Sequence, residues 1–143
     1  MNETLFLQKG QAFLALQPLS TLIGAELHAL TPGYCELHVP VTEKNFQQNG
    51  FVHGGVVSYA ADNALTFAGG TALGVPVVTS EFKINYVRPA VGERLIARAQ
   101  AVYAGQSQAV CRCDVFTVMN GEDKLCAVAQ GTIARLPAKN SST

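Results

Sequence analysis

Hydrophobic and polar residues alternate with a period of two along much of the second half of the chain. The clearest run is residues 110–116, with the sequence VCRCDVF. Such alternation is typical of a strand with one face in a core and the other in solvent. Breaks in the pattern fall at Pro89, at residues 104–105 and at Asn120-Gly121, a frequent hairpin turn. We therefore predict four strands in this half, Val77–Val87, Glu93–Tyr103, Gln108–Met119 and Lys124–Leu136.

The first half of the chain predicts a short helix and two more strands. Apolar residues at helical spacing favour a helix over Thr4–Leu16, within an N-terminal helical segment of residues 1–20. The strands are predicted at Gly24–Leu30 and Tyr34–Val41, joined by a turn at residues 31–33. At the other end of the chain, residues 137–143 are expected to be a frayed tail.

One long, alanine-rich apolar segment, His53–Leu73, is closed by Gly74-Val75-Pro76 and predicts a central helix. Gly69-Gly70 could fray this helix or end it early. The segment also contains Asp62, Asn63, hydroxyl residues and glycines, so a buried element is favoured over a membrane span.

Together these elements predict one domain over residues 1–143, of the α+β class. An antiparallel sheet of about six strands must wrap around a single apolar helix to bury it. Because one helix covers only one face of the sheet, we expect the other face to pack on another copy of the chain.

Composition narrows the classes of function. Lys plus Arg and Asp plus Glu both number 10, so the chain lacks the basic excess of a general nucleic-acid binder. Only 14% of residues are charged while 48% are hydrophobic, which favours an oligomer. No signal peptide is recognisable at the N-terminus, and we expect a cytoplasmic protein.

The cysteines and histidines are not spaced along the sequence as in known metal sites. The four cysteines form no CxxC pair and are interpreted as buried, reduced core residues: Cys35, Cys111, Cys113 and Cys126. His28 and His38 fall in predicted strands without partners at ligand spacing, so both are interpreted as structural. We expect no bound metal.

Asp62 is the only charged side chain between Lys44 and Glu81. In the middle of an apolar helix a carboxylate is costly, and burial would raise its pKa. Asp62 is then either a polar residue on an exposed edge of the helix, a cap for another element, or a catalytic nucleophile or general base.

His53-Gly54-Gly55 opens the same helix. The free N–H groups of a helix's first turn suit a developing oxyanion, and glycine lets a ligand approach the backbone. A glycine-rich entry into a packed helix is the alternative.

These two features cannot meet within one chain. Asp62 lies nine residues after His53, which is half a turn out of phase and about 13 Å along a helix. If both are catalytic, one chain's helix start must join the Asp62 of another chain, as a two-fold dimer allows. The sequence therefore predicts that a monomer is inactive.

Polar residues near this pair are lesser candidates. Thr66 follows Asp62 by four residues and could hold its carboxylate or a water. The others, each of which could equally be an ordinary loop, helix or strand residue, are Gln47, Asn49, Ser58, Tyr59, Thr79 and Ser80.

Two stretches resemble a known family. Residues 47–62, QQNGFVHGGVVSYAAD, and residues 79–89, TSEFKINYVRP, are similar to the hotdog-fold acyl-CoA thioesterases of the phenylacetate-degradation (PaaI-like) type. The spacing from HGG to the acidic residue and the Tyr-x-Arg-Pro ending carry this resemblance, which spans about Gly24–Leu136.

The resemblance implies a thioester hydrolase that acts as a dimer, often a dimer of dimers, with no cofactor beyond the coenzyme A of its substrate. The Gly54 N–H would polarise the thioester carbonyl, and Asp62 of the partner chain would attack it or activate water. Gln47 would bind the carbonyl or the water, and His53 would support the loop. Thr66 and Thr79 match positions where some members carry a functional hydroxyl.

For the substrate, Gly55, Asn49, Tyr59, Thr79, Ser80 and Arg88 are the binding candidates. Arg88 is the first choice for a coenzyme A phosphate, before Lys83, Arg94 and Arg135. The acyl pocket is expected near Phe51, Val52, Tyr59, Phe67 and Val78, and an aryl or a medium-chain acyl group remains open. Two alternatives are a non-catalytic acyl-CoA or acyl-carrier binding module and a hydratase-like relative on the same fold.

Overall fold

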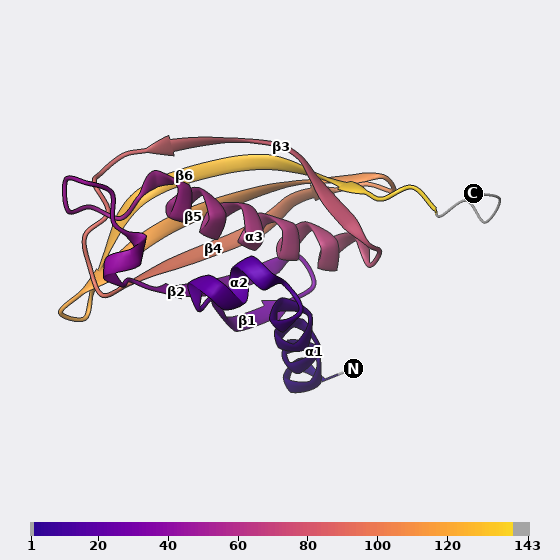
Figure 1. Ribbon diagram of the computed structural model, residues 1–143. Coiled ribbons are helices and arrows are strands. Elements are labelled where there is room, and N and C mark those ends of the chain that lie inside the picture. Colours follow the sequence, from indigo (N-terminus) through magenta and orange to yellow (C-terminus); the bar gives the residue numbers. More distant parts are fainter. Residues whose placement is uncertain (1, 139–143) are drawn as a thin grey trace.

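The computed structural model describes residues 2–138. A six-stranded antiparallel sheet curves around helix α3 (Gly54–Leu73), with strand order β1-β2-β4-β5-β6-β3 (Figure 1). The strands are β1 (Glu26–Thr31), β2 (Tyr34–Pro40), β3 (Val77–Tyr86), β4 (Arg94–Ala104), β5 (Gln108–Met119) and β6 (Glu122–Arg135). The prediction of six strands around one central helix is confirmed.

The N-terminal segment holds two helices where one was predicted. Helix α1 spans Glu3–Ala15, and a second helix, α2, spans Pro18–Ile23. Pro18 begins α2, and proline is favoured in the first turn of a helix because its missing N–H is not needed there. The segment therefore extends past residue 20, and Gly24 caps α2 with a φ of 81°.

Smaller differences lie at loops and ends. The polar loop before α3 contains a 3-10 turn, η1 (Glu43–Asn45), closed by reciprocal hydrogen bonds between Thr42 and Asn45. Residues 136–138 have no regular structure, and the rest of the predicted frayed tail, residues 139–143, lies outside the described residues. No helix within residues 2–138 is long and apolar enough to cross a membrane.

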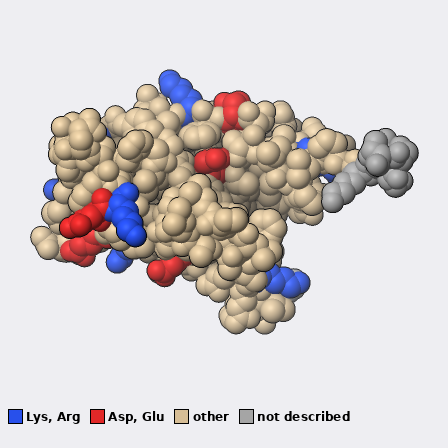
Figure 2. Space-filling view, viewed as in Figure 1, with Lys and Arg blue, Asp and Glu red and all other residues tan. Residues whose placement is uncertain are grey.

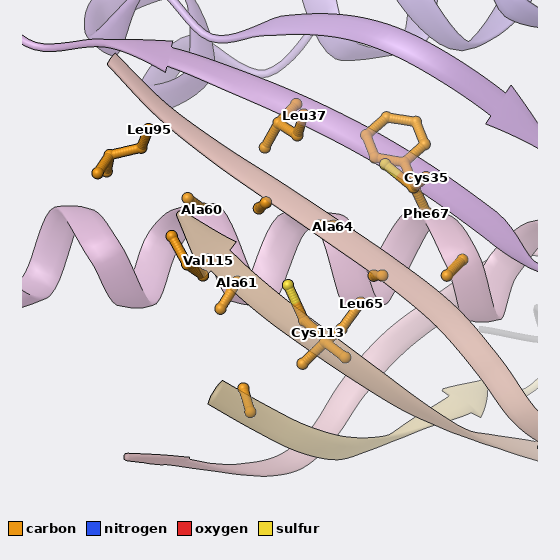
Figure 3. Packing of buried hydrophobic residues seen from close by; sticks show 14 of the residues in the cluster. Cys35, Leu37, Ala60, Ala61, Ala64, Leu65, Phe67, Leu95, Cys113 and Val115 are labelled. Atoms are coloured by element: carbon orange, nitrogen blue, oxygen red, sulfur yellow. The ribbon is translucent and has the colours of Figure 1, made fainter. Parts of the chain in front are cut away.

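Helix α3 approaches the sheet closely because its inner face is made of small side chains. Ala60, Ala61 and Ala64 have no exposed surface, and Figure 3 shows them facing core residues of β2, β4 and β5. The helix runs through Gly69 without fraying. A Cβ atom at this position would lie 2.5 Å from the Cβ atom of Ile133 in β6, so the packing requires glycine here.

Replacing Gly69 with alanine is therefore expected to destabilise the fold by about 1–3 kcal/mol, because overpacking outweighs the better helix propensity of alanine. Urea unfolding measures this loss of stability when wild type, Gly69→Ala and Gly70→Ala are compared. At Gly70 the nearest atom to a new Cβ is a single Val77 methyl at 3.1 Å, so the loss should be smaller. Equal stability of wild type and Gly69→Ala would contradict the packing argument.

Strand β3 is an exposed edge of the sheet. One side pairs with β6, and within residues 2–138 no strand pairs with the other. Val78 and Tyr86 are 49% and 54% exposed. Long unpaired edge strands with apolar side chains tend to associate with another strand.

The outer face of the sheet carries both charged and apolar side chains, with Ile96 opposite Phe116 and Arg98 opposite Asp114. Glu36 accepts a hydrogen bond from Arg98 at 2.8 Å, and Arg98 also lies 3.5 Å from Asp123 and over the ring of Phe116. A solvated outer face is normal for an antiparallel sheet. Our expectation that this face packs on another copy stays a prediction. Among the described residues, the two edge strands, β1 and β3, each lack a neighbouring strand on one side.

Candidate active site

The first turn of α3 is organised by His53. The Nδ1 atom of the His53 ring accepts the backbone N–H of Gly55 at 2.7 Å, and the backbone N–H of His53 donates to the carbonyl of Asn45 at 2.7 Å. The imidazole is thus a helix cap, in line with a supporting role. Because the N–H of Gly55 is taken, it is less suited to bind a ligand than predicted. The N–H of Gly54 has no hydrogen-bond acceptor among the described residues.

A cavity of about 370 Å³ lies beside Gly54. It brings together three predicted site residues, Gln47, Gly54 and Arg88. The Oε1 atom of Gln47 accepts the N–H of Asn49, which folds the preceding loop on itself. Asn49 is exposed and is not part of the cavity lining.

Tyr86 also lines this cavity and was not among the predicted site residues. Its hydroxyl donates to the carbonyl of Gly54 at 3.2 Å and pairs with the hydroxyl of Ser58. The Tyr-x-Arg-Pro sequence was the available signal, but only as a family likeness. The structure shows that Tyr86 fixes the first turn of α3 from the end of β3.

Asp62 contacts the opposite end of β3. Its Oδ1 atom accepts the hydroxyl of Thr79 at 2.6 Å. The hydroxyl of Thr66 lies 2.9 Å from that of Thr79 and 2.7 Å from the Asp62 carbonyl. Within the described residues, Oδ2 has no hydrogen-bond partner. The carboxylate is half-buried and held by hydroxyls, so in one chain it is less enclosed by apolar groups than expected.

Two other candidates are placed differently. The Tyr59 hydroxyl pairs with Ser20 of α2 and accepts from the amide of Asn63 at 3.0 Å, so it attaches α2 to α3. Ser80 is the extra residue of a β-bulge in β3 and is exposed.

The two candidate groups, the Gly54 N–H and the Asp62 carboxylate, lie apart from each other in one chain. Gly54 and Asp62 are about 12 Å apart along the helix axis. Tyr86 and Thr79, which contact them, stand at opposite ends of β3. The predicted separation of the two groups within a single chain is thus present in the structure.

A second cavity, of about 530 Å³, runs between α1 and α3 and reaches Thr66. Phe67 lines it, whereas Phe51 and Val52 line the cavity beside Gly54. Tyr59 and Val78 line neither of these two cavities. The residues expected around one acyl pocket are therefore divided between two places.

Of the four candidate phosphate ligands, Arg88 lies at the cavity that contains Gly54. Lys83, Arg94 and Arg135 are exposed and line neither cavity.

The four cysteines, Cys35, Cys111, Cys113 and Cys126, are buried and free, as predicted. Burial raises the pKa of Cys111 and of Cys126 to about 11, and it also raises the pKa of Cys35 and of Cys113 well above the ordinary value of a thiol. Neutral thiols of this kind are poor nucleophiles, which leaves the carboxylate of Asp62 as the stronger candidate.

His28 and His38 stack on the outer face with ring centroids 3.5 Å apart and planes within 2°. With Glu36 they bring potential metal ligands within 4.8 Å of one another. The lone pair of each ring nitrogen lies in the plane of its ring, so two parallel rings stacked on each other cannot both direct a lone pair at the same ion. In addition, Glu36 is already bound to Arg98. This geometry does not favour a metal site.

The histidine stack predicts a pH dependence of stability. Burial lowers the pKa of His38 below its ordinary 6.5, and the charges of His28 and Arg94 act in the same direction, against the opposing effect of Glu36. The unfolded chain then binds more protons than the folded chain around pH 6.5, so stability rises with pH through that window.

Urea unfolding between pH 7.5 and 5.5 should show this loss on acidification, and His38→Gln should reduce the slope by up to about 1.4 kcal/mol per pH unit. Burial would raise the pKa of Glu36, but hydrogen bonds from Arg98 and His38 outweigh this effect and hold the pKa low. The contribution of Glu36 to stability is therefore lost only at more acidic pH. Parallel slopes for wild type and variant would contradict the assignment to His38.

Comparison with known proteins gives a consistent result. The sequence model of the thioesterase superfamily matches residues 49–127. A thioesterase family protein from Silicibacter pomeroyi is 35% identical, with a TM-score of 0.83 over 89% of this chain and 95% of that one. A thioesterase from Haemophilus influenzae is 26% identical, with a TM-score of 0.83 over 96% of this chain and 94% of that one. The PaaI protein of Escherichia coli shares the fold, with 22% identity and a TM-score of 0.82 over 91% and 92% of the two chains.

Proposed function

The chain belongs to the thioesterase superfamily, and from this premise we propose that it hydrolyses an acyl-CoA thioester to a free acid and coenzyme A. The observation that carries the proposal is the pair of unsatisfied groups on α3. Among the described residues, the Gly54 N–H lacks an acceptor and the Asp62 Oδ2 lacks a donor. A donor for an oxyanion and a carboxylate for the attacking step are what this reaction requires.

We propose that the active enzyme is a homodimer formed through β3. A two-fold axis near the middle of this strand would pair it with its own copy in antiparallel fashion, at about 4.8 Å between strands. The start of one β3 would then lie beside the end of the other. Asp62, held by Thr79 at the start, would meet the Gly54 of the partner subunit, which contacts Tyr86 at the end.

The chemistry then follows from the charges. The Gly54 N–H stabilises the negative charge that develops on the thioester oxygen, and the helix dipole adds to it. Asp62 either attacks the carbonyl carbon to form an anhydride, which water then opens, or takes a proton from an attacking water. In both routes the C–S bond breaks, coenzyme A leaves as the thiolate and takes up a proton, and the acid is released.

Other residues of the site support this reaction. Thr79 donates to Oδ1 of Asp62 and leaves Oδ2 free to face the substrate. Gln47 lines the Gly54 cavity, where its amide can bind the carbonyl or the water, and Arg88 at the same cavity can pair with a phosphate of coenzyme A. His53 caps the helix and supports the oxyanion donor without transferring a proton.

Location and higher assembly are further parts of the proposal. Four buried free thiols fit the reducing cytoplasm. A dimer of dimers follows from the family resemblance, and light scattering of the purified protein would distinguish it from the dimer.

The proposal is tested by release of free thiol from a panel of acyl-CoA substrates with purified protein. Steady-state release that saturates with substrate is the expected result. Saturable binding of acyl-CoA without any thiol release would instead indicate a binding module. Conversion of an enoyl-CoA with full retention of the thioester would indicate a hydratase.

A further inference from the structure

We propose that the groove between α1 and α3 binds the acyl group and selects unbranched apolar chains of about eight to ten carbons over compact aryl groups such as phenylacetyl. This inference rests on the proposed function, because it names the substrate class of the same site.

The groove adjoins the carboxylate. Thr66 lines it, and the hydroxyl of Thr66 lies 2.9 Å from that of Thr79, which donates to Asp62. An acyl carbon next to the reacting carbonyl would therefore enter the groove at Thr66. The remaining length of α3 that faces the groove, as far as Gly74, lies beyond this point.

The length of the groove is set by α3. From Thr66, where the chain enters, to Gly74 the lining spans about 12 Å along the axis, which matches an extended chain of roughly eight to ten carbons. The volume of about 530 Å³ is within the range of about 300–1,000 Å³ found for small-molecule sites. A phenylacetyl group would leave about half of this length empty.

The walls are apolar. Phe6 and Phe13 of α1 face Phe67 of α3, and the rings of Phe13 and Phe67 meet edge to face at 6.2 Å. Pro76 and Leu136 stand among the lining residues at the sheet end. Lys9 is the one charged residue among the lining residues of this groove. Figure 2 shows the same scarcity of charge on the face that carries α1, α2 and α3.

Several polar groups at the Asn63 end bond to one another. The Asn63 amide donates to Gln17 at 3.0 Å, to Ser20 at 3.2 Å and to Tyr59 at 3.0 Å, so these oxygens are already paired with one another. Phe13 is 62% exposed, and an apolar chain in the groove would remove part of this surface from water.

The test measures kcat/KM for thiol release from a series of straight-chain acyl-CoAs, from acetyl to palmitoyl, with phenylacetyl-CoA beside them. Each methylene added within the groove is expected to raise kcat/KM by about threefold to fourfold. The rise should stop near eight to ten carbons. A preference for phenylacetyl-CoA, or equal values for butyryl- and dodecanoyl-CoA, would overturn the inference.

A variant that shortens the groove gives the sharper result. Leu136 is 44% exposed at its sheet end, so Leu136→Trp should fold. It should lower kcat/KM for dodecanoyl-CoA at least tenfold, with a loss that shrinks as the chain shortens. Ala12→Trp, on an exposed part of α1 outside the lining, is the matched control and should leave the profile unchanged. An equal loss for every chain length would refute the groove as the acyl site.

Failure of the groove assignment differs from failure of the proposed function. If no acyl-CoA releases thiol, the hydrolase proposal fails, and calorimetric binding of decanoyl-CoA to wild type and to Leu136→Trp still tests the groove. Weaker binding to the variant supports the groove, and equal binding overturns it. If short substrates are hydrolysed without any dependence on chain length, the hydrolase stands and the groove assignment falls.

Discussion

Replacing Asp62 with asparagine is expected to lower kcat for acyl-CoA hydrolysis by about 10²–10⁴-fold while leaving the fold and the dimer intact. Asparagine keeps the size of the side chain and an oxygen that can accept the hydroxyl of Thr79. It removes the negative charge that attacks the thioester or takes a proton from water. Because binding groups are unchanged, KM should move far less than kcat.

Steady-state thiol release and size-exclusion chromatography measure the two parts of this prediction. Asp114→Asn is the matched control, since Asp114 is a half-buried carboxylate on β5 that lines neither cavity. Unchanged turnover in a pure Asp62→Asn protein would rule out the carboxylate as a catalytic group. Activity lost together with the dimer would point to a structural role instead.

The strands of the sheet were predictable because half-buried strands show a local alternation of apolar and polar residues. The limits of β5 were predicted correctly as Gln108–Met119, and the other strands differ by one or two residues at their ends. Helix α2, by contrast, is six residues long, too short to show a helical period. No local pattern marks β3 as an edge strand, because that depends on the order in which distant strands pair.

The sequence supplied the candidate residues of the site but not the contacts among them. Gln47, Gly54 and Arg88 line one cavity, and Asp62 lies with Thr66 and Thr79 at the other end of β3. The pairing of Tyr86 with the first turn of α3 joins residues about thirty positions apart, which no spacing rule reveals. The engagement of the Tyr59 hydroxyl by Ser20 depends on α2, the helix that the sequence pattern did not predict.

If the active site is shared between two chains, as we propose, inactive variants should complement one another. Gly54→Pro removes the oxyanion donor and little else, because proline is favoured in the first turn of a helix. His53 has φ −58° and ψ 134°, a conformation compatible with a following proline, and a Cβ at position 54 would approach Tyr86 no closer than 3.4 Å. Loss of one oxyanion donor is expected to lower kcat by about 10²–10³-fold.

A heterodimer of one Asp62→Asn chain and one Gly54→Pro chain, purified through two different tags, should then regain about half of the wild-type activity. One of its two sites joins the intact Gly54 of the first chain with the intact Asp62 of the second. The other site carries both lesions. If the two groups acted within one chain, neither site would be intact and the heterodimer would stay inactive.

The reciprocal heterodimer makes the distinction complete. A wild-type chain paired with a chain that carries both substitutions has one lesion in each shared site, so it should be inactive when the site is built from two chains. If both groups acted in the same chain, the wild-type subunit would keep its own site and the dimer would retain about half of the activity. The two heterodimers contain the same substitutions in the same number, so differences in folding or expression cannot produce opposite activities. Only the position of Asp62 relative to the partner's oxyanion donor can do so.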